Sequence, residues 1–88
     1  MIDHGFKTCV LETLKYNQTD IRRRMKEERV IELAASIKST MAMEPLIVHS
    51  KTKVLICGRD RLAAYFINEM RMGPCHLVDA DAAEVATL

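Results

Sequence analysis

The chain has 88 residues, 49% of them hydrophobic, which predicts a single domain spanning residues 1–88 because two independent cores would not fit. Its 13 basic and 12 acidic residues leave a formal net charge of +1, which argues against the broad basic surface of a nonspecific nucleic-acid binder. Three cysteines without CxxC spacing, no signal-peptide pattern and no long apolar run predict a reduced, cytoplasmic protein outside the membrane.

The first half of the chain predicts one strand and one helix. Residues 9–14 favour a short strand, and a polar segment follows at residues 15–26. From residue 27 to residue 40, apolar side chains recur at helical spacing, so we expect a helix with one buried face. Pro45 cannot continue that helix, which therefore ends before it.

The second half begins with a predicted hairpin. Residues 45–49 and 54–57 are strand-like, and the polar stretch between them is short enough for a turn. A largely buried helix fits residues 60–72, and Gly73-Pro74 is expected to end it.

The last residues predict two further elements. Residues 76–78 favour a short strand, and Asp81 with Glu84 resembles a capping pair for a final helix at residues 82–88. The order of these elements predicts an α+β fold in which a small mixed sheet packs with three helices.

The strongest local motif is the turn Gly58-Arg59-Asp60-Arg61, where a strand leads through glycine into a helix. The first turn of a helix presents unpaired backbone N–H groups and a partial positive charge, which favour phosphate. Glycine allows close approach of the backbone, and arginine offers paired donors to phosphate oxygens. The turn is therefore the leading candidate for an anion site.

Three motifs together resemble the ParB/sulfiredoxin superfamily over about residues 8–88. The turn at Gly58 is similar to the family's G-x-R-R or G-x-H-R helix start, and residues 31–38 are similar to its "eLaaSIk" helix, with a Pro45 box after it. Asp20-Ile21-Arg22-Arg23 stands in the place of the "Q-P-R-R" box of ParB proteins. The resemblance implies the ParB/sulfiredoxin-like α+β fold.

The resemblance also implies a nucleotide pocket that takes CTP with magnesium in ParB proteins and ATP in sulfiredoxins. A related branch of the superfamily phosphorylates free serine. The residues that would bind the nucleotide are Gly58, Arg61 and Arg59 at the phosphates, Asp60 in the same turn, Arg22 or Arg23 from the polar segment, and Ser36, Glu44 and Pro45 at the base or sugar.

The turn departs from the family at two positions. Arg59 stands where ParB proteins have a glutamate and where sulfiredoxins have their nucleophilic cysteine. Sulfiredoxin chemistry is therefore not expected, and a nucleotide triphosphatase or a small-molecule kinase remains the alternative for an active enzyme. Asp60 stands where the family usually has arginine or histidine, and it either caps the helix, which we favour, or binds a divalent cation.

Other residues have structural as well as functional interpretations. The basic cluster at residues 22–29 either contacts phosphate or pairs with neighbouring glutamates on a solvated flank. Arg61 could pair with a carboxylate instead of an anion, and Cys57 reads as a small hydrophobe. The spacing of histidine and cysteine predicts no metal site. Met41 and Met43 would suit a partner surface if they are exposed.

Two functional hypotheses follow. The first is a ParB-like regulatory or switch domain that binds CTP or ATP with magnesium in a DNA-partition or transcription-regulation system and acts through self-association or a protein partner. The second is a protein-interaction module, of a phage or mobile-element type, that has lost the nucleotide. No helix-turn-helix is visible in the sequence, so we expect no direct sequence-specific contact with DNA.

Overall fold

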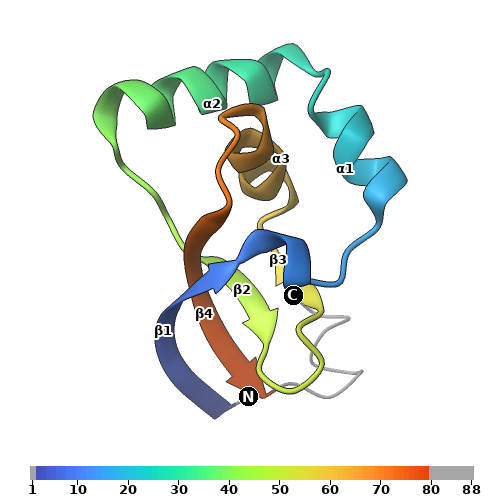
Figure 1. Ribbon diagram of the computed structural model, residues 1–88, viewed down its shortest axis with the longest axis vertical. Helices are drawn as coiled ribbons and strands as arrows, with labels where there is room; N and C mark the ends of the chain where they lie inside the picture. The colour runs from blue at the N-terminus through green and yellow to red at the C-terminus, as the bar shows by residue number, and fades with distance from the viewer. Residues whose placement is uncertain (1, 80–88) are drawn as a thin grey trace.

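The computed structural model describes residues 2–79 of the chain. Over these residues a four-stranded sheet lies at one end of the molecule and the helices gather at the other (Figure 1). The elements in chain order are β1 (Ile2–Val10), a 3-10 turn (Leu11–Thr13), α1 (Gln18–Arg24), α2 (Glu28–Thr40), β2 (Leu46–His49), β3 (Leu55–Cys57), α3 (Arg59–Ile67) and β4 (Met72–Asp79). The predicted α+β fold with a small mixed sheet and three helices is confirmed, and the helix expected at residues 82–88 lies outside the described residues.

The sheet has the order β1-β4-β2-β3. Strand β4 runs antiparallel to β1 and parallel to β2, so the sheet is mixed. β2 and β3 form the predicted hairpin, in which the amide of His49 donates to the Val54 carbonyl at 2.9 Å. The predicted strand at residues 76–78 is confirmed as part of the longer β4.

The first strand differs from the prediction of residues 9–14. β1 begins at Ile2 and ends at Val10, because its pairing with β4 ends at Val10 opposite Met72. The chain then turns, and the Leu11 amide donates to the Arg71 carbonyl at 2.9 Å. This turn brings the side chain of Leu11 into the core, where it is fully buried.

The polar segment contains a helix that the sequence pattern did not predict. α1 begins after Asn17, whose side chain accepts a hydrogen bond from the Asp20 amide at 3.0 Å. Ile21 is the only residue of this helix that is buried. A helix with one buried side chain has no apolar periodicity, so the prediction missed it.

Helix α2 begins within one residue of the prediction, but α3 ends five residues earlier than predicted. After Ile67 the chain leaves the helix at Asn68, and Glu69 takes a left-handed φ of 57°, which stops the helix. Gly73-Pro74 does not end α3 but belongs to β4. The proline is tolerated there because the pairing of β4 with β2 begins only at the next residue, Cys75.

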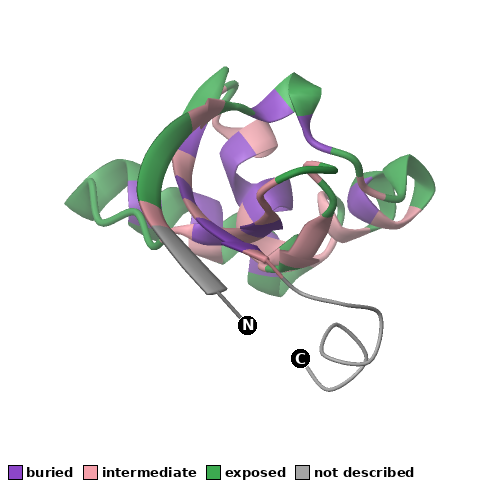
Figure 2. Cartoon of the chain, turned by 90° about the horizontal axis from the view of Figure 1, so that it is seen from below, coloured by how far each residue is buried: buried purple, intermediate pink, exposed green. Residues whose placement is uncertain are grey.

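The core is centred on α3. Four consecutive residues of this helix, Leu62 to Tyr65, have no exposed surface, and the sheet contributes fully buried side chains such as Leu46, Val48 and Cys75. Buried segments meet in the interior, whereas β1 is largely exposed over residues 5–10 (Figure 2). Tyr65 is the largest fully buried side chain, and its hydroxyl donates to the Glu44 carbonyl at 2.5 Å. None of the helices described is long and apolar enough to cross a membrane.

Candidate functional site

The helix start that the sequence singled out lies directly against β2. Gly58 is the N-cap residue of α3 and has a φ of 104°. A Cβ atom placed on Gly58 would lie 2.9 Å from Leu46 Cδ2 and 3.6 Å from Leu46 Cα. Only glycine therefore allows β3 to turn into α3 this close to β2.

Next to this helix start, six side chains from α1, α2 and α3 and the segment between α1 and α2 form a closed ring of alternating charges. Each carboxylate binds two arginines through its two oxygens, and each arginine binds two carboxylates. The oxygen–nitrogen distances are between 2.6 and 2.9 Å. In order around the ring the residues are Asp20, Arg24, Asp60, Arg29, Glu27 and Arg23.

The ion pairs of the ring shift the pKa values of its members. The hydrogen bonds from Arg23 and then Arg24 hold the pKa of the Asp20 carboxyl below its ordinary value. The bonds to Asp60 and then Asp20 raise the pKa of the Arg24 guanidinium. The three arginines and the three carboxylates of the ring have opposite charges, so the ring as a whole has no net charge. The N-cap interpretation of Asp60 is wrong, because Gly58 is the N-cap, and the Asp60 carboxylate instead binds Arg24 and Arg29 at 2.6 Å each. That Asp60 binds a divalent cation stays a prediction.

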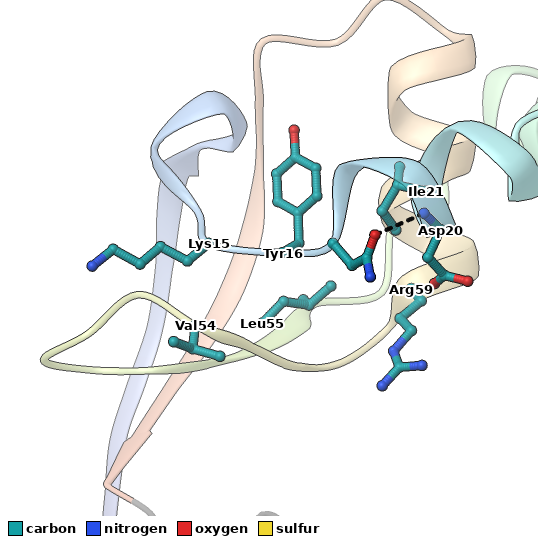
Figure 3. A pocket seen from close by; sticks show the side chains of 8 residues that line it. Lys15, Tyr16, Asp20, Ile21, Val54, Leu55 and Arg59 are labelled. Carbon is teal, nitrogen blue, oxygen red and sulfur yellow. Dashed lines mark hydrogen bonds between the residues drawn. The ribbon is translucent and has the colours of Figure 1, made fainter.

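A cleft of about 520 Å³ opens beside the ring (Figure 3). Lys15 and Arg59 supply its cationic side chains and stand at opposite ends in this view, and Asp20 belongs both to the cleft wall and to the ring. Arg59 is exposed and makes no ion pair with any residue from 5 to 79. The full lining is Lys15, Tyr16, Asn17, Asp20, Ile21, Val54, Leu55 and Arg59.

The cleft forms because the segment before α1 runs beside β3. The Lys15 amide donates to the Lys53 carbonyl at 2.8 Å, and the Leu55 amide donates to the Lys15 carbonyl at 2.9 Å. The ring of Tyr16 packs on Phe66 of α3 with a centroid distance of 5.7 Å. These contacts hold the segment before α1 against β3 and α3, which positions the residues that line the cleft.

The residues predicted for the site are only partly brought together. Arg59 lines the cleft, and Asp60 and Arg23 join the ring. Arg61 pairs with Glu44 at 2.5 Å, which is the pairing with a carboxylate predicted as the alternative to an anion. Pro45 follows that glutamate in the chain. Ser36 is exposed on α2, and Arg22 lines a separate hollow of about 260 Å³ beside Phe66.

Sequence reasoning missed three residues that line the cleft just before α1: Lys15, Tyr16 and Asn17. A signal for Asn17 was present, because an asparagine followed three residues later by an acidic residue, here Asp20, is typical of a helix start. Among the described residues no group of three histidine, cysteine or acidic side chains could hold a metal ion. Cys57 is exposed and Cys75 is fully buried.

A second hollow is apolar and lies at the C-terminal end of α2. It has a volume of about 230 Å³ and is lined by Ile37, Lys38, Met41, Met43, Asn68 and Met70. Met41 is 73% exposed and Met43 is 42% exposed. The exposure that would make these methionines suitable for a partner surface is therefore present.

Comparisons with known proteins agree with this architecture. The family model described as "ParB N-terminal domain" matches residues 4–88. The structure is similar to that of the C-terminally truncated chromosome-partitioning protein ParB from Caulobacter crescentus complexed with CTP-gamma-S, with a TM-score of 0.76 and 22% identity. It is also similar to a Pnob8-like ParB-N domain in its C2221 form, with a TM-score of 0.66 and 20% identity.

The similar structures are longer than this chain. The alignment covers 94% of this chain and 49% of the Caulobacter protein, and 89% of this chain and 31% of the Pnob8-like chain. The chain thus spans about half the length of the first and about a third of the second. No curated protein matches the chain in sequence.

Proposed function

Because this chain belongs to the ParB N-terminal domain family, we propose that it binds a nucleoside triphosphate, CTP or ATP, in the cleft beside the start of α3. In this proposal the domain acts as a regulatory switch in a DNA-partition or transcription-regulation system. The Caulobacter protein with the same fold is described as complexed with CTP-gamma-S, which supports CTP as the first nucleotide to test.

The observation that carries the proposal is the placement of Arg59. It is the one arginine that lines the cleft, and no carboxylate among residues 5–79 neutralises it. Lys15 adds a second cation, and the half-buried turn at Gly58 leads into the helix start that favours anions. The cleft volume of about 520 Å³ falls within the range of small-molecule sites, which is about 300–1,000 Å³.

Magnesium fits this cleft only as part of the nucleotide. Asp20 is the one acidic residue in the lining, and both of its oxygens already bind arginines of the ring. The ion would therefore be held by phosphate oxygens and water, as Mg²⁺ commonly is in nucleotide sites. For the same reason Asp20 and Asp60 are poor general bases, so we propose binding and do not assign a hydrolytic or transfer reaction.

Calorimetric titration with CTP, ATP and GTP, each with magnesium, tests the proposal. We expect binding of CTP or ATP, and we expect Arg59→Ala to weaken that binding by about tenfold or more because a charged hydrogen bond to phosphate is lost. Arg71→Ala is the matched control, since Arg71 is also exposed and lies outside the cleft. Absence of binding for all three nucleotides would overturn the proposal.

The second candidate function, a protein-interaction module, has one observation in its favour. The exposed Met41 and Met43 border the apolar hollow at the end of α2, and flexible methionines suit a surface that adapts to a partner. Sedimentation measurements on the wild type and on Met41→Gln with Met43→Gln would show whether this surface supports self-association. Loss of an observed dimer in the variant, together with no nucleotide binding by the wild type, would favour this function.

A further inference from the structure

Asp60 receives two guanidinium groups from two different helices. Arg24 belongs to α1 and Arg29 to α2, and each donates to a separate oxygen of the Asp60 carboxylate at 2.6 Å. The carboxylate itself stands in the first turn of α3. Two arginines thus converge on one small anion whose position is fixed by a third helix.

This arrangement has the chemistry of a phosphate site. Planar guanidinium groups bind the oxygens of carboxylate and of phosphate in the same way, with charge-assisted bonds of this length. The side chain of Arg24 is only 18% exposed, so its guanidinium is poorly solvated. The side chain of Arg29 is 62% exposed, which leaves one side of the pair open to solvent. The pair is partly desolvated and accessible from outside.

We propose that Arg24 and Arg29 form a phosphate-binding site that the chain's own Asp60 carboxylate occupies, so that a phosphate group binds there only in place of Asp60. The inference deepens the proposed function, because Asp20 joins the ring to the cleft and the phosphates of a nucleotide in the cleft would lie next to this site. Asp60 then acts as an internal competitor that sets how tightly phosphate binds.

The net charge of the ring depends on the Asp60 carboxylate. With Asp60 in place, the three arginines face three carboxylates and the ring is neutral, so an incoming anion gains little. When the carboxylate is removed, Arg24 keeps only Asp20 and Arg29 keeps only Glu27. The ring then has one positive charge in excess, and one donor that bound Asp60 is freed on each of the two arginines.

The test measures inorganic tripolyphosphate binding by calorimetry to the wild type and to Asp60→Asn. We expect Asp60→Asn to bind at least about tenfold more tightly, since two charge-assisted hydrogen bonds become available to the anion. Glu32→Gln is the matched control: Glu32 is exposed on α2 outside the ring, and its loss changes the net charge by the same amount. Adding Arg24→Gln and Arg29→Gln to Asp60→Asn should abolish the gain.

Equal or weaker binding by a folded Asp60→Asn variant, or an equal gain in Glu32→Gln, would overturn the inference. If circular dichroism shows that Asp60→Asn does not fold, an NMR titration of the wild type with tripolyphosphate tests the inference instead. Excess tripolyphosphate should then shift the side-chain N–H resonances of Arg24 and Arg29 in NMR spectra, and shifts confined to Arg59 or no shifts would refute the site.

The outcome is separable from that of the proposed function. Nucleotide binding to the wild type tests the cleft, whereas the tripolyphosphate comparison uses no base or sugar. A gain in Asp60→Asn without nucleotide binding to the wild type would support the masked phosphate site and refute the nucleotide cleft. Nucleotide binding without any gain in Asp60→Asn would do the opposite.

Discussion

At the scale of single residues, Gly58 and Gly5 share a left-handed backbone but differ in their surroundings. Gly58 has a φ of 104° and Gly5 a φ of 83°. A Cβ atom at Gly58 would meet the fully buried Leu46, while one at Gly5 would meet no atom within 4 Å. The two glycines therefore separate the cost of an unfavourable φ from the cost of a steric clash.

We expect Gly58→Ala to lower the free energy of unfolding by about 2–4 kcal/mol, because backbone strain and overpacking against Leu46 add together. Gly5→Ala should cost about 1–2 kcal/mol, from the backbone alone. Urea denaturation of both variants measures the difference. Equal losses would show that Leu46 moves aside without cost.

At the same scale, the sequence predicted the course of the backbone at Gly58 but not the contacts of the side chains that follow it. A strand that leads through glycine into a helix could be predicted from the pattern, and so could the close approach that glycine allows. The partners of Asp60 could not, because Arg24 and Arg29 lie 36 and 31 residues away and meet it only in the folded chain. The ion pairs between Asp20, Arg23 and Arg24 lie three and four residues apart, so helical spacing would have found them once α1 was recognised.

At the scale of the elements, α1 depends on its ends and its charges more than on its packing. Its one buried side chain is Ile21, its N-cap is Asn17, and its acidic Asp20 joins the ring that reaches α3. A seven-residue helix of this kind is too short to be stable alone. Its position against α3, and with it one wall of the cleft, rests on these few contacts.

We expect Asn17→Ala to destabilise the protein by about 1 kcal/mol, because the Asp20 amide loses the side-chain oxygen that caps the helix. Thermal unfolding measures the loss. Asn17→Asp, which keeps a capping oxygen, should retain wild-type stability, and Gln18→Ala serves as a neighbouring exposed control. Loss of stability in Asn17→Asp equal to that in Asn17→Ala would contradict the capping role.

The elements that the sequence predicted well are those with a regular apolar pattern. Helix α2 and the β2–β3 hairpin were found almost to the residue, because α2 buries one helical face and because β2 alternates between buried and half-buried residues before a short polar turn. The end of α3 was missed because Met70 and Met72 continue the helical spacing of apolar residues, although the left-handed Glu69 already stops the helix. A residue other than glycine in that conformation gives no signal in the sequence.

At the scale of the whole molecule, titratable groups at both ends of the pH range link charge to stability. The pKa of the Asp20 carboxyl lies below its ordinary value of 3.8 because Arg23 and Arg24 bind the charged form. Its contribution is complete above about pH 4 and is lost as the pH falls through the lowered pKa. Burial, with a contact to Cys9 as a smaller cause, raises the pKa of the Cys75 thiol from 9.0 to about 12.

We expect the free energy of unfolding to decrease when the pH is lowered below about 4. We expect it to decrease again as the pH rises from 9 toward 12, because the unfolded chain releases the Cys75 proton before the folded chain does. Asp20→Asn should flatten the acid limb, and Cys75→Ala should make the alkaline limb shallower. Denaturation at a series of pH values measures both limbs. Unchanged slopes in the variants would contradict these assignments.

The place of β4 in the sheet has a consequence for how the protein is made. β4 lies between β1 and β2, and its register pairs Ile2 with Asp79. During translation β1 leaves the ribosome first, yet its partner strand is synthesised last among the strands described. The nascent chain therefore carries β1 without its partner strand until residues 72–79 have been synthesised. We expect ribosome-bound chains that stop before Met72 to be bound by chaperones, and protection of β1 to appear only after Asp79 has emerged.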